Sequence, residues 1–177
     1  MNVIIKLHDR SMVPHPLHTA GIDWPERLAP LTQSSRCALV RDPEIGPLLA
    51  AADVLVTDHS TVGFEFALLD RPIVIFDAPD LLRAARIDPA KWAFLRSMGS
   101  VVSSPDGLAA AVTEALAQPA AGSGARRQAS DLFAHAGTAT ARALAVVYQL
   151  LEVAPAATAG AGAPLAMSSP VEGTRPT

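Results

Sequence analysis

The sequence has little cysteine, few aromatic residues and no long apolar run. Its 177 residues include a single cysteine, Cys37, which has no partner for an internal disulfide. No stretch approaches the roughly 20 apolar residues that a membrane-spanning helix needs. The first residues also lack the basic, apolar and small-residue pattern of a secretory leader. These absences predict a reduced, cytoplasmic protein.

Neither positive nor negative charge predominates in the sequence. The chain carries 14 Lys and Arg against 17 Asp and Glu, a net charge of −3, and its basic residues are scattered along the sequence. Nucleic-acid-binding proteins usually neutralise several phosphates with a clustered basic patch, so no nucleic-acid partner is expected. Half of the residues are hydrophobic, which excludes a strongly disordered chain and allows one globular domain.

Five short segments rich in β-branched or apolar residues predict strands, at residues 3–7, 37–40, 54–57, 73–76 and 101–103. Most are continuously apolar, as strands covered on both faces are. Helix-compatible stretches alternate with them, at residues 24–31, 44–52, 60–69, 79–98 with breaks, 106–118, 125–135 and 138–153. This alternation predicts an α/β fold with a doubly wound parallel sheet, whose ligands bind beyond the carboxyl ends of the strands.

Both ends of the chain depart from a complete domain of this kind. Residues 154–177 are mostly Ala, Pro, Gly, Ser and Thr without apolar periodicity, which predicts a disordered tail. The helix at 138–153 is expected to dock on the sheet, giving one domain at residues 1–153. No G-x-G-x-x-G turn precedes the first predicted strand. We therefore expect a partial domain that lacks its opening strand.

The strand at 54–57 runs into Asp58-His59-Ser60-Thr61, where a helix is predicted to begin. Hydroxyl groups and free backbone N–H groups at a helix start suit an anion such as phosphate, and Gly63 permits close approach. Plain capping explains the same residues: Ser60 or Thr61 accepts from an early helix N–H, and Asp58 closes the turn. Glu65 could bond a ribose hydroxyl, or it is a solvated acid in the first turn.

Five short motifs lie along the chain: Lys-Leu-His at 6–8, Thr-Asp-His-Ser-Thr-Val at 57–62, Glu-Phe-Ala at 65–67, Arg-Pro at 71–72 and Gly-Thr-Ala-Thr-Ala-Arg at 137–142. Together they resemble the CDP-glycerol glycerophosphotransferase family of teichoic-acid polymerases and primases. The resemblance spans about residues 2–152. The resemblance covers only the C-terminal half of that family's catalytic region.

The resemblance implies a GT-B architecture, in which two Rossmann-like domains hold the donor in the cleft between them. It implies transfer of glycerol phosphate from CDP-glycerol, or a similar nucleotide-diphosphate donor, to a hydroxyl of a lipid-linked polyol or glycan acceptor, with release of CMP. No cofactor is implied. A lipid-linked acceptor would place the enzyme peripherally at the inner face of the cell membrane.

The resemblance also implies roles for individual residues. His8 is expected to be catalytic and to contact the donor diphosphate; Ser60, Thr61, Asp58 and Arg142 are expected at that diphosphate, and Glu65 at the ribose. On its own chemistry, His8 could equally be a neutral histidine bonded at a strand end. Arg142 could equally be an exposed helix charge.

Two positions depart from the family pattern, and the roles of His15 and His18 stay open. Asp9 stands where the family commonly has proline, and His59 stands where it has tyrosine, so a ligand contact by His59 is unsettled. His15 and His18 lie with His8 near prolines that fix no common face, and no cysteine or acid completes a metal-ligand spacing. A metal site is not expected.

The resemblance implies that the catalytic base is a histidine in the portion of the family's sequence that precedes this chain. A missing N-terminal half or a partner chain would therefore be needed for activity.

Two alternative functions remain open. A related GT-B glycosyltransferase or UDP-sugar 2-epimerase would use the same diphosphate cradle, because fold does not fix function. A non-catalytic fragment would fold or bind a partner without binding a nucleotide.

Overall fold

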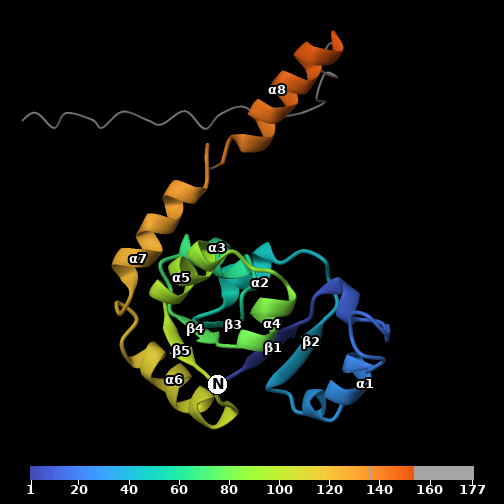
Figure 1. The fold of residues 1–177 in the computed structure, drawn as a ribbon, viewed down its shortest axis with the longest axis vertical. Helices are drawn as coiled ribbons and strands as arrows, with labels where there is room; N and C mark the ends of the chain where they lie inside the picture. Colours follow the sequence, from blue (N-terminus) through green and yellow to red (C-terminus); the bar gives the residue numbers. More distant parts are fainter. Residues whose placement is uncertain (136, 154–177) are drawn as a thin grey trace, which may run out of the picture. The chain divides into compact units, whose positions relative to one another are not determined.

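The computed structural model describes residues 1–135 and 137–153 (Figure 1). The chain divides into two compact units, Met1–Leu132 and Phe133–Thr177. The predicted disordered tail at 154–177 lies outside the described residues. The prediction of one domain at residues 1–153 remains a prediction.

The first unit contains five strands, which confirms the α/β class with parallel strands. β1 (Val3–Lys6) pairs in parallel with β2 (Cys37–Val40), with Val3 opposite Cys37. A second sheet holds β3 (Leu55–Thr57), β4 (Ile73–Phe76) and β5 (Ser100–Val102) in that order, also parallel. The strands lie within one or two residues of the segments that the sequence predicts. They form two sheets, however, where the sequence suggests one.

Helices connect these strands as the alternation predicts. In the first unit they are α1 (Trp24–Leu28), α2 (Gly46–Ala51), α3 (Val62–Ala67), α4 (Pro79–Ala84), α5 (Pro89–Ser97), α6 (Pro105–Ala117) and α7 (Ser123–Gln128), with 3-10 turns at Asp9–Ser11, Leu31–Gln33 and Ala129–Leu132. The second unit contains α8 (Ala139–Leu151). Local chemistry fixes several starts: Asp23 accepts from the Glu26 amide at 2.9 Å, and Asp88 accepts from the Ala90 amide at 2.8 Å.

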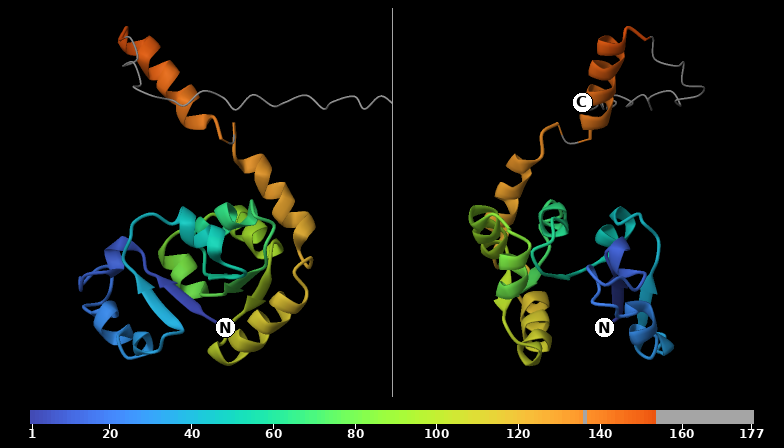
Figure 2. Two further views of the ribbon diagram at one scale, coloured as in Figure 1. Left: turned by 180° about the vertical axis from the view of Figure 1, so that it is seen from behind. Right: turned by 45° about the vertical axis from the view of Figure 1, so that its right-hand side comes forward.

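The core is centred on β4, the middle strand of the second sheet. Ile73, Val74 and Ile75 are 1%, 0% and 0% exposed. Val112 and Ala115 of α6 form a buried cluster with Val74, and α3 also contacts β4 (Figure 2). Burial on both faces explains why this segment reads as a continuous apolar run, because neither face meets water.

None of the helices in the described ranges, 1–135 and 137–153, is long and apolar enough to cross a membrane.

Candidate functional site

The turn after β3 holds the residues that the sequence analysis placed at an anion site. The Asp58 carboxylate accepts a hydrogen bond from the Ser60 amide at 3.0 Å, and the Ser60 hydroxyl lies 3.4 Å from the Val62 amide as an acceptor. Asp58 therefore closes the turn, as the capping alternative expects, while the Ser60 contact is at the long limit of a hydrogen bond.

Thr61 and Glu65 occupy the start of α3, and both are exposed. Thr61 is the N-cap residue, yet within the described residues its side chain makes no capping hydrogen bond. Its hydroxyl is thus not committed to stabilising the helix. Glu65 lies in the first turn, where a carboxylate interacts favourably with the helix dipole.

Gly63 has a packing role in the structure. A Cβ built on Gly63 would lie 2.6 Å from Cδ1 of Leu95, a core residue of α5 that is 1% exposed. The close approach that glycine permits at this point is therefore an approach of α3 to α5. The sequence analysis assigned that freedom to a phosphate, and the structure gives a sufficient reason without one.

His8 follows β1 and caps the short 3-10 turn at Asp9–Ser11. Its Nδ1 accepts from the Arg10 amide at 3.1 Å, and the residue is exposed. A neutral imidazole that accepts at Nδ1 carries its proton on Nε2, so His8 presents a donor. Lys6 is engaged nearby, since its ammonium group donates to the Asp9 carboxylate at 3.2 Å.

Two polar atoms beside the predicted residues lack partners among the described residues. They are Nδ1 of His59, which lies 3.6 Å from Oδ2 of Asp58, and Oδ1 of Asp77, directly after β4. The other oxygen of Asp77 accepts from Arg96 at 2.7 Å. The sequence analysis did not single out Asp77 or Arg96. The only signal was position, because Asp77 follows the carboxyl end of a buried strand.

The remaining candidates are separate from this turn. Arg142 lies on α8 in the second unit, where its backbone amide donates to the Thr138 carbonyl at 3.0 Å and its side chain is exposed. His15 and His18 stack on each other with ring centroids 4.7 Å apart. Among the described residues, no group of three His, Cys, Asp or Glu side chains is arranged to hold a metal ion.

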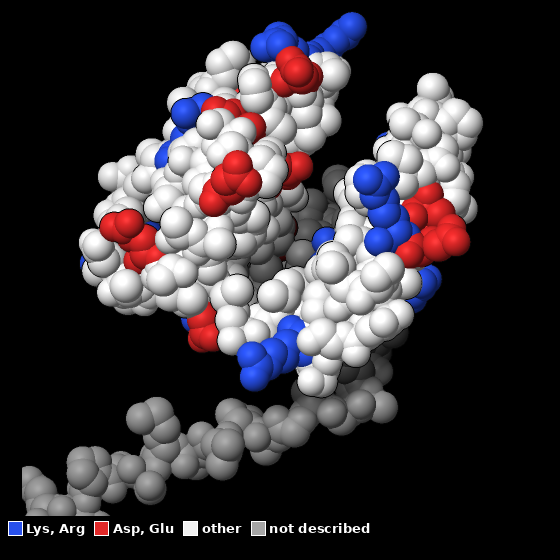
Figure 3. All heavy atoms as spheres, turned by 90° about the horizontal axis from the view of Figure 1, so that it is seen from below, with Lys and Arg blue, Asp and Glu red and all other residues white. Residues whose placement is uncertain are grey.

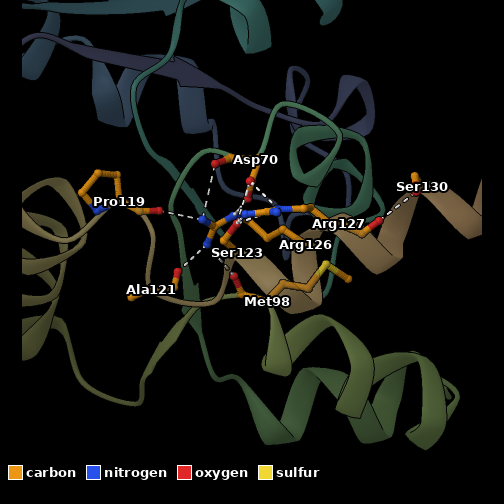
Figure 4. A network of polar contacts seen from close by, with 8 residues as sticks. All are labelled: Asp70, Met98, Pro119, Ala121, Ser123, Arg126, Arg127 and Ser130. Atoms are coloured by element: carbon orange, nitrogen blue, oxygen red, sulfur yellow. Dashed lines mark hydrogen bonds and ion pairs between the residues drawn. The ribbon is translucent and has the colours of Figure 1, made fainter.

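A cluster around Asp70 is the densest polar network of the first unit (Figure 4). Arg126, 1% exposed, donates to the Asp70 carboxylate at 3.1 Å and to the carbonyls of Pro119 and Ala121 at 2.6 Å each. The Ser123 hydroxyl donates to Asp70 at 2.7 Å. This hydroxyl, aided by the side chains of Arg127 and Arg126, holds the pKa of Asp70 below its usual value against an opposing effect of burial.

The network is structural, because its groups satisfy one another and fasten α7 to the turn between α3 and β4. Sequence reasoning missed it. Arg126 reads as an ordinary helix arginine, and its burial depends on residues more than fifty positions away.

The wider surface adds two observations. A pocket of about 220 Å³ lies beside β5 and α6, lined by residues such as Val101, Ala111 and Gln118, and none of the predicted site residues lines it. On the face drawn in Figure 3, basic side chains lie interspersed with acidic ones. Any phosphate on this face would therefore meet local donors instead of a broad positive field.

Comparison with known proteins identifies the family. Residues 11–149 match the family model for CDP-glycerol:poly(glycerophosphate) glycerophosphotransferase, so His8 lies just outside the matched range. A teichoic acid poly(ribitol-phosphate) polymerase of Bacillus spizizenii is 50% identical over 42 residues, which are 23% of this chain and 7% of that protein.

A teichoic acid glycerol-phosphate primase of the same organism is 37% identical over 62 residues, which are 35% of this chain and 15% of that protein. The matched segments thus cover only a small part of these relatives. No solved structure matches the chain. The family match covers most of the sequence, and the chain belongs to the CDP-glycerol:poly(glycerophosphate) glycerophosphotransferase family.

Proposed function

We propose that this chain supplies the donor-binding half of a transferase that moves glycerol phosphate from CDP-glycerol to a hydroxyl group of a teichoic-acid-like polymer. The observation that carries the proposal is the turn after β3. There Asp58 orders the backbone, and the Thr61 hydroxyl stands exposed at the start of α3 without a capping bond in the described part of the chain. Family membership supports the reaction class, and the donor's identity is part of the proposal.

The chemistry of the transfer explains why hydrogen-bond donors are needed at the phosphate groups. The acceptor hydroxyl oxygen attacks the phosphorus that bears glycerol, the bond to the bridging oxygen breaks, and CMP leaves with that oxygen. Negative charge gathers on the phosphate oxygens as this occurs, so hydrogen-bond donors that meet those oxygens stabilise the transition state. The Nε2–H of His8 and the hydroxyls of Ser60 and Thr61 are donors of this type.

The other predicted residues take supporting roles in this proposal. Asp58 is a positioning residue at the diphosphate, because its carboxylate already accepts from the Ser60 amide and would repel a phosphate in direct contact. Glu65 accepts from a ribose hydroxyl. Arg142 is a further diphosphate-binding residue in the proposal, because its guanidinium group can pair with phosphate oxygens.

The proposal extends to the whole enzyme. In this proposal, residues 1–153 form the nucleotide-binding domain of a GT-B architecture. An N-terminal half or a partner chain adds the base that takes the acceptor's proton. The acceptor is a lipid-linked polyol or glycan. Contact with it holds the protein at the inner face of the cell membrane.

Calorimetric titration of the purified chain with CDP-glycerol, CDP, CMP and UDP-GlcNAc tests the proposal. We expect cytidine-selective binding that Thr61→Val and Ser60→Ala weaken about 5- to 50-fold, the value of one or two charge-assisted hydrogen bonds. Thr113→Val is the matched control, because its hydroxyl bonds the Ala109 carbonyl on the exposed face of α6.

Each other outcome selects a different function. Preference for UDP-GlcNAc would replace the proposal with a sugar-nucleotide enzyme of related fold. A folded chain that binds none of the four nucleotides would contradict it and favour the non-catalytic fragment. Equal losses in Thr61→Val and Thr113→Val would remove the turn after β3 from the binding site.

A further inference from the structure

Four strands of the first unit, β1, β2, β3 and β5, each have one open edge. β1 pairs only with β2, and β3 pairs only with β4, among the residues that the structure describes. Figure 2 shows β1 with β2 and β3 with β4 and β5 as separate sheets. An open strand edge presents unpaired N–H and C=O groups, which is a template for another strand.

The backbone hydrogen bonds identify which groups face these open edges. The Val3 amide donates towards β2, to the Arg36 carbonyl at 2.8 Å, and the Leu55 amide donates towards β4, to the Pro72 carbonyl at 3.1 Å. Successive residues of a strand direct their peptide groups to opposite sides. The amides of Ile4 and Val56 therefore face the open edges of β1 and β3.

The side chains at these strands are unusually exposed for a buried parallel sheet. Val3 and Ile4 of β1 are 42% and 48% exposed, and Val56 of β3 is 44% exposed. In contrast, Val74 and Ile75 of β4, which has a strand on each side, are both 0% exposed. Apolar residues at strands of this type are expected to be covered on both faces.

The strand order indicates what is absent. In the common doubly wound order, the first strand is central, the second and third lie to one side of it, and the remaining strands lie to the other. If the central first strand is left out, β1 and β2 correspond to the second and third strands of that order, on one side. β3, β4 and β5 correspond to the fourth, fifth and sixth strands, on the other side. One parallel strand between β1 and β3 would join the two sheets into that single arrangement.

We propose that the open edges of β1 and β3 form a docking site for one parallel, continuously apolar β-strand that lies outside residues 1–177. The strand would receive hydrogen bonds from the Ile4 and Val56 amides and would cover the side chains beside them. Continuous apolar character follows from its central place, where helices cover both faces. This proposal stands whether or not the chain binds a nucleotide.

The occupant is a strand from the part of a glycerophosphotransferase that this chain does not cover. The two curated relatives are several times longer than the segments matched here, which are 7% and 15% of their lengths. Residues 154–177 are unsuited to the role because four prolines interrupt them, and proline is excluded from central strands. A second copy has no spare strand among the described residues, since each of its strands already pairs within its own sheet.

Hydrogen exchange with a surrogate strand tests the proposal on the full chain. The probe is a synthetic peptide of residues 71–77, whose Ile-Val-Ile-Phe segment forms the buried strand β4, flanked by lysines for solubility. We expect it to slow exchange at residues 3–6 and 55–57 by about tenfold or more. The same peptide carrying V74P is the control and should have no effect, because proline cannot complete the ladder.

Variants of the protein distinguish strand pairing at the open edges from non-specific binding of the apolar peptide. Val56→Pro removes the open-edge amide, whereas Val56→Thr keeps it with a side chain of similar shape. Only Val56→Thr should retain the response to the peptide. Ile4→Pro and Ile4→Thr repeat the comparison on β1, so the test survives if one proline variant fails to fold.

Three results would overturn the proposal. The first is unchanged exchange at both strands with the peptide at millimolar concentration. The second is protection confined to β5, the other exposed edge of its sheet. The third is strong protection of the Ile4 and Val56 amides in the free protein, which would mean that these edges already have a partner.

Discussion

At the residue scale, Asp70 offers a measurable pH dependence. Hydrogen bonds from Ser123 and the two arginines lower its pKa in the folded state, whereas the unfolded carboxylate titrates near pH 4. A lowered pKa means that the ionised carboxylate adds stability above the unfolded pKa, and that this stability is lost as the pH falls through the folded pKa. Asp70→Asn should therefore be less stable than the wild type at pH 7, by about 1 kcal/mol, because the Asp70 side chain is 36% exposed and solvent screens its charge.

The difference between Asp70→Asn and the wild type should shrink as the pH falls below about 4, because protonation removes the charge from the wild type as well. Urea unfolding at pH 7, 5 and 3 measures it. Asparagine also tolerates the positive φ of 49° at this position, so the substitution tests charge and not backbone strain. Asp53→Asn, at an exposed position, is the control. A stability loss that is constant with pH would contradict the assigned role of the carboxylate.

At the element scale, Gly99 fixes how β5 joins the sheet. A Cβ added to Gly99 would overlap the backbone carbonyl of Ile73 at the start of β4. Backbone cannot rotate away as a side chain can, so Gly99→Ala should lower the free energy of unfolding by about 1–3 kcal/mol. Gly46→Ala is the matched control at the start of α2, where an added Cβ has no neighbour within 4 Å. Thermal unfolding compares the two variants, and equal melting temperatures would show that β5 can shift to relieve the contact.

The elements themselves could be predicted well because their signals are local. The segments at 37–40 and 73–76 match β2 and β4 residue for residue, since continuous apolar runs bounded by polar residues have few other solutions. The helix expected at 79–98 divides into α4 and α5 around Arg86, whose φ is 51°, and the Asp88-Pro89 cap.

Features that depend on distant contacts could not be read from the sequence. The burial of Arg126 and the contact of Gly63 with Leu95 arise only when helices pack, so neither leaves a local pattern. The division into two sheets depends on which strands become neighbours. Of the predicted site, the sequence located the turn at Asp58–Thr61, while the packing of Asp77 beside Arg96 required the fold.

At the scale of the whole molecule, the docking site and the proposed donor site should be coupled. Nucleotides bind doubly wound sheets where the strand order reverses, and here that point lies beside the open edge of β3. A strand between β1 and β3 would bring His8, at the end of β1, and Thr61, after β3, to one edge of a single sheet. Each ligand would then bind a protein that the other has already ordered. The second ligand to bind would therefore lose less conformational entropy and bind more tightly.

Linkage requires the coupling to be reciprocal. We expect the peptide of residues 71–77 to tighten CDP binding at least about fivefold, and CDP to tighten peptide binding by the same factor. Two calorimetric titrations, each with the other ligand at saturation, measure both factors, and the V74P peptide is the control. If the peptide protects β1 and β3 while CDP affinity stays constant, strand docking holds but does not assemble the donor site. The nucleotide contacts would then lie within the β3–β5 sheet alone, and His8 would have no part in them.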